Sequence, residues 1–98
     1  MAIKSFRDKV TEDINYGRVS KRTLRILPAG LQQKAQIKLA VLGAATSLND
    51  LLELRGNRLE ALKGDRSGQH SIRINDQYRI CFIWTGTDAI EVEIVDYH

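Results

Sequence analysis

The chain has 98 residues, of which 43% are hydrophobic and 28% charged, and its formal net charge is +3. This balance is typical of one globular domain spanning residues 1–98, and it excludes both a disordered chain and a second core. The single cysteine cannot form an internal disulfide, and no run of about 18 apolar residues could cross a membrane, so we expect a cytoplasmic protein.

The first half of the chain carries helical patterns. Ser5 and Asp8 resemble a capping box, and apolar residues then recur at helical spacing up to Gly17. Residues 18–27 have no clean period and are compatible with a basic loop. Pro28 suits the first turn of the next helix. The apolar stripe of that helix consists of Leu31, Ala35, Leu39 and Leu42.

The second half alternates between apolar and polar residues, as β-strands do. Residues 69–74 and 78–84 predict two strands, and residues 75–77 between them predict a tight turn. An earlier strand is expected over residues 58–62 and a last one over residues 90–95. Helices followed by strands predict an α+β fold, with N-terminal helices covering one face of a twisted antiparallel sheet.

The register of the predicted hairpin decides which side chains share a face. A three-residue turn sets Ile72 opposite Ile80 on the apolar face and Arg73 opposite Arg79 on the other, where we expect both arginines to be exposed. Two directly opposed arginines either hold an anion between them or splay into solvent. The same register puts His70 at the edge of the apolar face.

Basic residues are unevenly distributed along the chain. Residues 18–38 contain six lysines and arginines and no acid, whereas residues 80–98 contain four carboxylates and neither lysine nor arginine. Such asymmetry is compatible with a surface that faces a polyanion and equally with a solvated helix face.

The last three residues, Asp96, Tyr97 and His98, are all able to transfer protons and directly follow an apolar strand. RNA cleavage needs a base for the 2′-OH proton, an acid for the leaving 5′-oxygen, and cations for the phosphate. Histidine titrates near neutrality and can serve either proton step, although a terminal histidine can equally be a frayed tail. Tyr97 is also a candidate for stacking on a base.

No motif points to a metal or another cofactor. His70, Cys81 and His98 lack the spacing of metal ligands, and no glycine-rich phosphate loop is present. Cys81 has no evident base beside it and is not expected to be a nucleophile. The sequence therefore predicts no cofactor.

Four segments carry a resemblance to a known family. They are Leu62-Lys63-Gly64-Asp65, residues 69–75, Tyr78-Arg79-Ile80 and Val95-Asp96-Tyr97-His98. In this order and spacing they resemble the HigB branch of the RelE superfamily of bacterial toxins, with a specific match from about residue 57 onward. The resemblance implies a RelE-like fold and a metal-independent endoribonuclease that enters the ribosomal A site and cuts mRNA there.

The resemblance also implies roles for individual residues. Lys63 and Arg79 would hold the scissile phosphate and stabilise its additional charge. The C-terminal residues 96–98 would orient the nucleotide and move protons. Arg73 is added to the RNA-binding residues by the strand register rather than by the family motif.

Glu60 departs from the pattern of many HigB toxins, which carry a histidine three residues before the motif lysine. A glutamate can act as a general base, so Glu60 joins the catalytic candidates, but it cannot stabilise phosphate charge as a cation can. The departure implies weaker chemistry or a changed division of roles. It also supports an alternative function, in which a basic module blocks translation or ribosome maturation without cleavage.

The partners that the resemblance implies are a cognate antitoxin, HigA-like with a helix-turn-helix, the ribosome and its mRNA, and operator DNA reached through the antitoxin. Residues 18–27 lie outside the specific match. We expect this segment to order on antitoxin binding or to modulate toxicity.

Overall fold

The structure, a computed structural model, describes residues 2–96, with the helices first and the strands last. The helices are α1 (Lys9–Asn15), α2 (Lys21–Ile26), α3 (Ala29–Ala44) and α4 (Leu48–Glu53), followed by the 3₁₀ turn η1 (Arg55–Asn57). The strands are β1 (Glu60–Ala61), β2 (His70–Arg73), β3 (Tyr78–Trp84) and β4 (Ala89–Asp96), and the 3₁₀ turn η2 (Gly64–Arg66) lies between β1 and β2. Within residues 2–96, no helix has the length and apolar character needed to cross a lipid bilayer.

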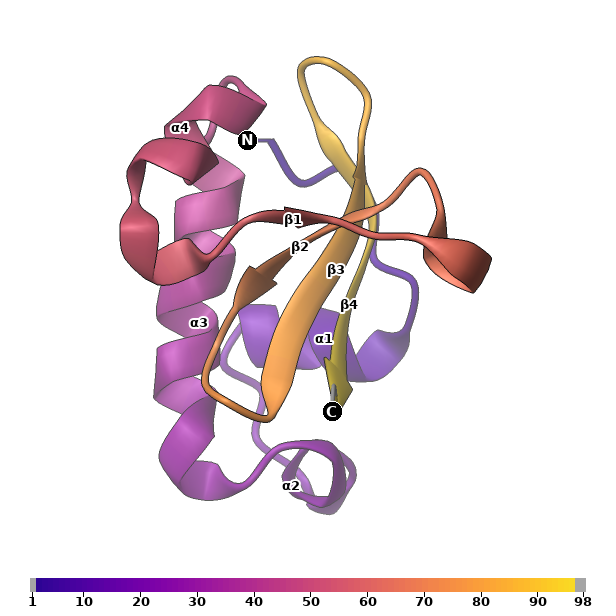
Figure 1. Ribbon diagram of the computed structural model, residues 1–98. Helices are drawn as coiled ribbons and strands as arrows, with labels where there is room; N and C mark the ends of the chain where they lie inside the picture. Colours follow the sequence, from indigo (N-terminus) through magenta and orange to yellow (C-terminus); the bar gives the residue numbers. More distant parts are fainter. Residues whose placement is uncertain (1, 97–98) are drawn as a thin grey trace.

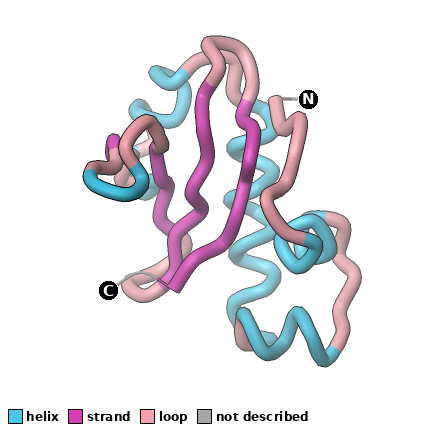
Figure 2. The backbone as a smooth tube through the Cα atoms, turned by 90° about the vertical axis from the view of Figure 1, so that its right-hand side faces the viewer, coloured by secondary structure: helices cyan, strands magenta, loops and turns pink. Residues whose placement is uncertain are grey.

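The four strands form one antiparallel sheet in the order β1-β2-β3-β4, and α1 and α3 lie on one side of it (Figures 1 and 2). This is the α+β arrangement expected from the sequence. The expected hairpin register is also confirmed, because Ile72 pairs with Ile80 and Arg73 pairs with Arg79. The largest fully buried core side chains include Ile14, Leu27, Leu39, Leu42, Ile72, Ile80, Phe82 and Val92.

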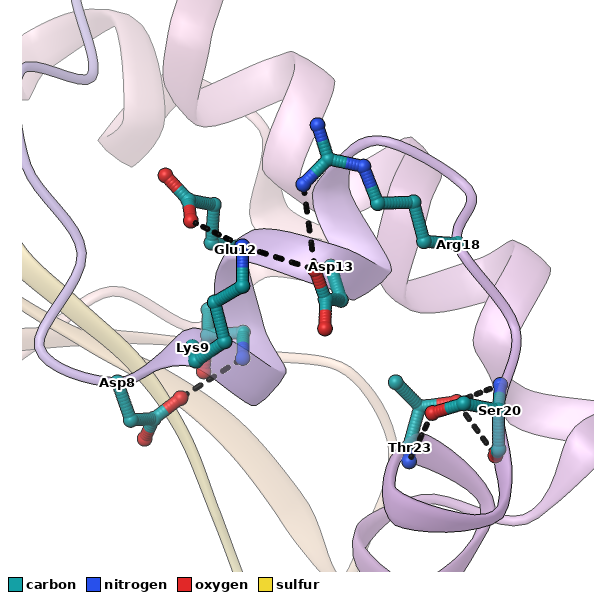
Figure 3. Close-up of polar contacts among 8 residues, drawn as sticks. Asp8, Lys9, Glu12, Asp13, Arg18, Ser20 and Thr23 are labelled. Carbon is teal, nitrogen blue, oxygen red and sulfur yellow. Dashed lines mark hydrogen bonds and ion pairs between the residues drawn. The ribbon is translucent and has the colours of Figure 1, made fainter.

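Helix α1 begins later than the sequence pattern indicates. Its N-cap is Asp8, whose carboxylate accepts a hydrogen bond of 2.7 Å from the backbone N–H of Thr11 (Figure 3). Ser5 is not part of a capping box, because its hydroxyl oxygen accepts a 2.9 Å bond from the backbone N–H of Glu91 in β4. The hydroxyl of Thr11 accepts a 3.0 Å bond from the N–H of Ile94, which fixes α1 against the sheet.

The segment expected as a basic loop forms helix α2. Its start is a capping box in which the Ser20 hydroxyl accepts from the Thr23 N–H and the Thr23 hydroxyl accepts from the Ser20 N–H (Figure 3). The end of α2 is fixed by buried Gln32 of α3, whose side-chain amide donates a 3.0 Å bond to the carbonyl of Leu27. Lys21, which lies on this helix, is exposed.

The first strand is shorter than expected and the last is longer. Arg58, at the end of η1, has φ 45° and ψ 54°, a left-handed conformation far from the extended backbone of a regular strand, and β1 begins only at Glu60. Beyond β4 the sheet is bordered by the N-terminal segment, through parallel bridges from Ile3 to Ala89 and from Phe6 to Val92. Residues 3–6 therefore border β4 on the side opposite β3.

Candidate functional site

The face of the sheet turned away from α1 and α3 carries polar side chains that are nevertheless buried. Ser71 and Cys81 pair across β2 and β3 and are both fully buried, and Arg79, two residues before Cys81, is only 7% exposed. The prediction that both paired arginines are exposed is therefore wrong for Arg79. Arg79 is buried because acceptors on its own face bind its guanidinium.

Arg79 is held by a set of hydrogen bonds from neighbouring elements. Its Nε donates to the hydroxyl of Ser71 at 2.7 Å, and its Nη2 donates to the backbone carbonyls of Ser71, at 3.3 Å, and of Arg58. Its Nη1 also lies 3.9 Å from the carboxylate of Glu60 in β1. A planar guanidinium fixed on two nitrogens has a defined orientation, which a binding site for a tetrahedral anion requires.

The turn that supplies the Arg58 carbonyl is itself anchored. Asn57 is fully buried, its amide donates a 3.1 Å bond to the carbonyl of Leu51, and its side-chain oxygen accepts a 2.8 Å bond from the ammonium of Lys38. A left-handed residue other than glycine costs on the order of 1 kcal/mol or more, so it persists only where its surroundings fix it. These contacts stabilise the backbone at Arg58 and aim its carbonyl at Arg79.

Beside this network lies an open hollow of about 300 Å³, which we call the arginine hollow. It is lined by Arg58, Glu60, Arg73, Asn75, Asp76 and Arg79. Three guanidinium groups and two carboxylates meet there, so the lining carries one net positive charge before the surrounding residues are considered. Guanidinium groups bind phosphate oxygens through paired N–H donors, and a phosphate is therefore the ligand that this lining favours.

Both carboxylates in the arginine hollow are held loosely. Asp76 ion-pairs with Arg73, but its side chain is 97% exposed. Glu60 is 54% exposed and approaches Arg79 only to 3.9 Å, which is beyond hydrogen-bond distance. Exposed ion pairs contribute about 0–1 kcal/mol, so an incoming polyanion can replace either carboxylate at small cost.

Lys63 is not among the residues that line the arginine hollow. It is exposed and follows β1, which runs antiparallel to β2 with Ala61 paired to His70. Arg73 lies at the other end of β2, so the register separates Lys63 from it by several residues along the sheet, at about 3.3 Å per residue. The described residues thus bring Arg73 and Arg79 together, without Lys63.

The C-terminal candidates are described only in part. Asp96 pairs with Tyr78, one position from Arg79, and accepts a 3.1 Å bond from the side-chain amide of Gln77. Strand alternation puts Val95, rather than Asp96, on the face of the sheet that carries Arg79. Tyr97 and His98 lie outside the described residues.

Two other titratable candidates behave as the sequence predicts. His70 pairs with Phe82 on the apolar side, with ring centroids 6.2 Å apart, and its buried Nδ1 has no hydrogen-bond partner among residues 2–96. Burial raises the pKa of the Cys81 thiol, which keeps it protonated and inert. Within the described part of the chain, no cluster of side chains could hold a metal ion.

Sequence reasoning missed several residues that build the site. Ser71 could have been found, because alternation with Arg73 puts it on the arginine face. Arg58, Asn57 and Lys38 carried no such signal, since they reach Arg79 through contacts between residues far apart in the chain.

Comparison with known proteins gives two concordant results. Residues 4–98 match the family described as RelE-like toxin of type II toxin-antitoxin system HigB. Among individual proteins, the chain is 42% identical over 66 residues to Toxin HigB-1 of Vibrio cholerae serotype O1, and this match covers 67% of the chain and 70% of the relative.

Proposed function

The chain belongs to the HigB family of RelE-like toxins from type II toxin–antitoxin systems, and we propose that it cleaves mRNA on the ribosome. The observation that carries this proposal is Arg79, fixed by Ser71 and the Arg58 carbonyl beside a hollow suited to a phosphate. A cation held in place before the reaction stabilises charge that develops on the phosphate without reorganisation. We further propose that the activity needs no metal and that the protein acts in the cytoplasm.

The proposed chemistry is attack of the 2′-OH oxygen on the adjacent phosphorus, with departure of the 5′-oxygen of the next nucleotide. Arg79 stabilises the phosphorane charge, and Arg73 binds a neighbouring phosphate oxygen. His98 moves a proton, with Tyr97 and Asp96 orienting the nucleotide, as the family resemblance implies. Lys63 acts as a further phosphate contact, and Glu60 is a candidate base.

Primer extension on translated mRNA tests the proposal. The parent should produce discrete new 5′ ends inside codons, also with EDTA at concentrations that leave the ribosomes intact. Arg79→Ala, or removal of His98, should strongly reduce these ends and relieve growth arrest while the domain stays folded by circular dichroism. If both variants arrest growth like the parent, the assignment of the site is wrong.

A second candidate function is blockade of a ribosomal site without cleavage. Glu60 favours this function, because its carboxylate lies 3.9 Å from Arg79 in the arginine hollow. A negative charge at that position opposes the binding of a phosphate at Arg79. The same experiment separates the two functions, because inhibited translation without new 5′ ends supports blockade.

Membership of the family implies a cognate antitoxin, which we propose is a HigA-like helix-turn-helix protein that links the toxin to operator DNA. Helix α2 is already formed in the isolated chain, which does not support the expectation that this segment orders only on binding. We propose that α2 and the turn before it contact the antitoxin, because apolar side chains of this region are exposed. They are Tyr16, Val19, Leu24 and Ile26.

The antitoxin contact is tested by co-purification with the antitoxin. Leu24→Asp should reduce retention of the antitoxin, whereas Leu52→Asp, at another exposed leucine, which lies on α4, should not. Equal retention of the two variants would remove α2 from the interface.

A further inference from the structure

Beside the arginine hollow, cations from three separate elements gather on one surface. Lys34 and Lys38 are one turn apart on α3 and therefore share a face of that helix. Lys38 reaches Asn57, and the next residue, Arg58, lines the arginine hollow together with Arg73. We call Lys34, Lys38, Arg58 and Arg73 the basic ridge.

The positive charge of the basic ridge is not balanced by carboxylates. Among residues 2–96, none lies within ion-pair distance of Lys34, Lys38 or Arg58, and Arg73 pairs only with the fully accessible Asp76. Burial lowers the pKa of Lys38, and the nearby charges of Lys34 and Arg73 lower it further. Like charges held together weaken the fold slightly, and an anion that binds among them relieves this repulsion.

The basic ridge is also linked to the candidate site through hydrogen bonds. The contact of Lys38 with Asn57 supports the turn whose next carbonyl, that of Arg58, accepts a hydrogen bond from Arg79. A ligand that spans the ridge therefore also contacts the arginine hollow, because Arg58 and Arg73 line it. Separate cations along a path suit a flexible chain of phosphates better than a single small anion.

We propose that the basic ridge binds the backbone phosphates of the RNA strand next to the phosphate held at Arg79. The strand runs from the arginine hollow, past Arg58 and Arg73, onto the exposed face of α3 at Lys38 and Lys34. This inference rests on the proposed function, since it takes the polyanion to be RNA. An acidic segment of the antitoxin is the competing occupant.

The test measures binding of the full chain to a fluorescent single-stranded 2′-O-methyl RNA, which has no free 2′-OH for the cleavage reaction. The double variant Lys34→Gln with Lys38→Gln is compared with Lys4→Gln with Lys9→Gln, which removes the same charge from exposed residues elsewhere. We expect the ridge variant to bind about tenfold more weakly at low salt, with a salt slope shallower by about 1.4, or 0.7 for each lost phosphate contact. The control pair should stay close to the parent.

Because Lys38 also donates a hydrogen bond to Asn57, the double variant could lose affinity through a folding defect. Two single variants distinguish such a defect from the loss of a phosphate contact. Lys34→Glu changes an exposed side chain with no contact to Asn57 and should still weaken RNA binding several-fold. Lys38→Arg keeps the charge and should retain most of the affinity.

The outcomes separate this inference from the proposed function. Equal weakening of the ridge and control pairs would overturn the inference, even if ribosomal cleavage is observed. Loss of antitoxin binding with unchanged RNA binding would overturn it in favour of the acidic partner. Ridge-dependent binding of the 2′-O-methyl RNA by a protein that never cuts mRNA would support the ridge and reject the cleavage.

Discussion

Both faces of the sheet contain buried side chains, but different kinds of contact bury them. On the face towards the helices, apolar packing buries Ile72, Ile80 and Phe82. On the other face, Ser71 and Arg79 are buried and hydrogen-bonded to each other, and Arg79 also donates to the Arg58 carbonyl after the η1 turn. Apolar packing has no preferred direction, whereas hydrogen bonds fix orientation. The first face therefore contributes stability without fixing a direction, whereas the second face also determines where a guanidinium points.

The largest effect is expected on the apolar face, where Phe82→Ala should lower the free energy of unfolding by about 3–5 kcal/mol. The cause is the cavity left between the sheet and the helices. Urea denaturation measures it, with Phe82→Leu as a milder control expected to cost less. Catalytic rate per folded molecule should change little. If this rate collapses along with stability, the two faces are not separable.

Arg79→Ala should instead remove the hydrogen bonds of the polar face. We expect a loss of about 10²–10³ in the rate of mRNA cleavage, the usual effect of removing one fixed donor to developing charge. Arg79→Lys should also be impaired, because an ammonium cannot bind Ser71 and the Arg58 carbonyl with the geometry of a guanidinium. Full activity of the lysine variant would show that charge alone suffices.

Ser71→Ala tests the polar face by removing a single oxygen atom, the side-chain hydroxyl. It removes the acceptor of the Arg79 Nε proton and should cost about 1–3 kcal/mol in stability, with a measurable loss of cleavage rate. Cys81→Ala is the matched control, since Cys81 pairs with Ser71, is equally buried and lies on the same face. It should reduce stability without changing the cleavage rate. Identical kinetic losses would argue against a positioning role for Ser71.

The smallest effect is expected for Glu60→Gln. Stability should stay within about 0.5 kcal/mol, because the exposed Glu60 carboxylate approaches Arg79 only to 3.9 Å, beyond hydrogen-bond distance. Affinity for a non-cleavable RNA should rise a few-fold as a competing carboxylate disappears, and Asp76→Asn provides the comparison at Arg73. Should cleavage fall although binding improves, Glu60 acts as a general base.

Local patterns predicted the hairpin correctly and missed features that depend on distant residues. The Arg73–Arg79 pair followed from a three-residue turn and strand alternation, both of which are local. Helix α2 was missed because a short capping box begins it inside a basic segment without apolar period. The burial of Arg79 was missed because one of its acceptors, the Arg58 carbonyl, lies 21 residues away. The roles of Lys63, Glu60 and residues 96–98 stay predictions.

The N-terminal segment along β4 has a consequence for the order of folding. The bond between Ser5 and Glu91 joins residues 86 positions apart, so closing this contact costs more chain entropy than closing any hairpin of the sheet. Contacts of such long range are expected to form late. Until residues 3–6 dock, one side of β4 presents unpaired backbone groups, which are a template for association between copies. The molecule is thus most prone to aggregation in the interval between sheet formation and arrival of its own N-terminus.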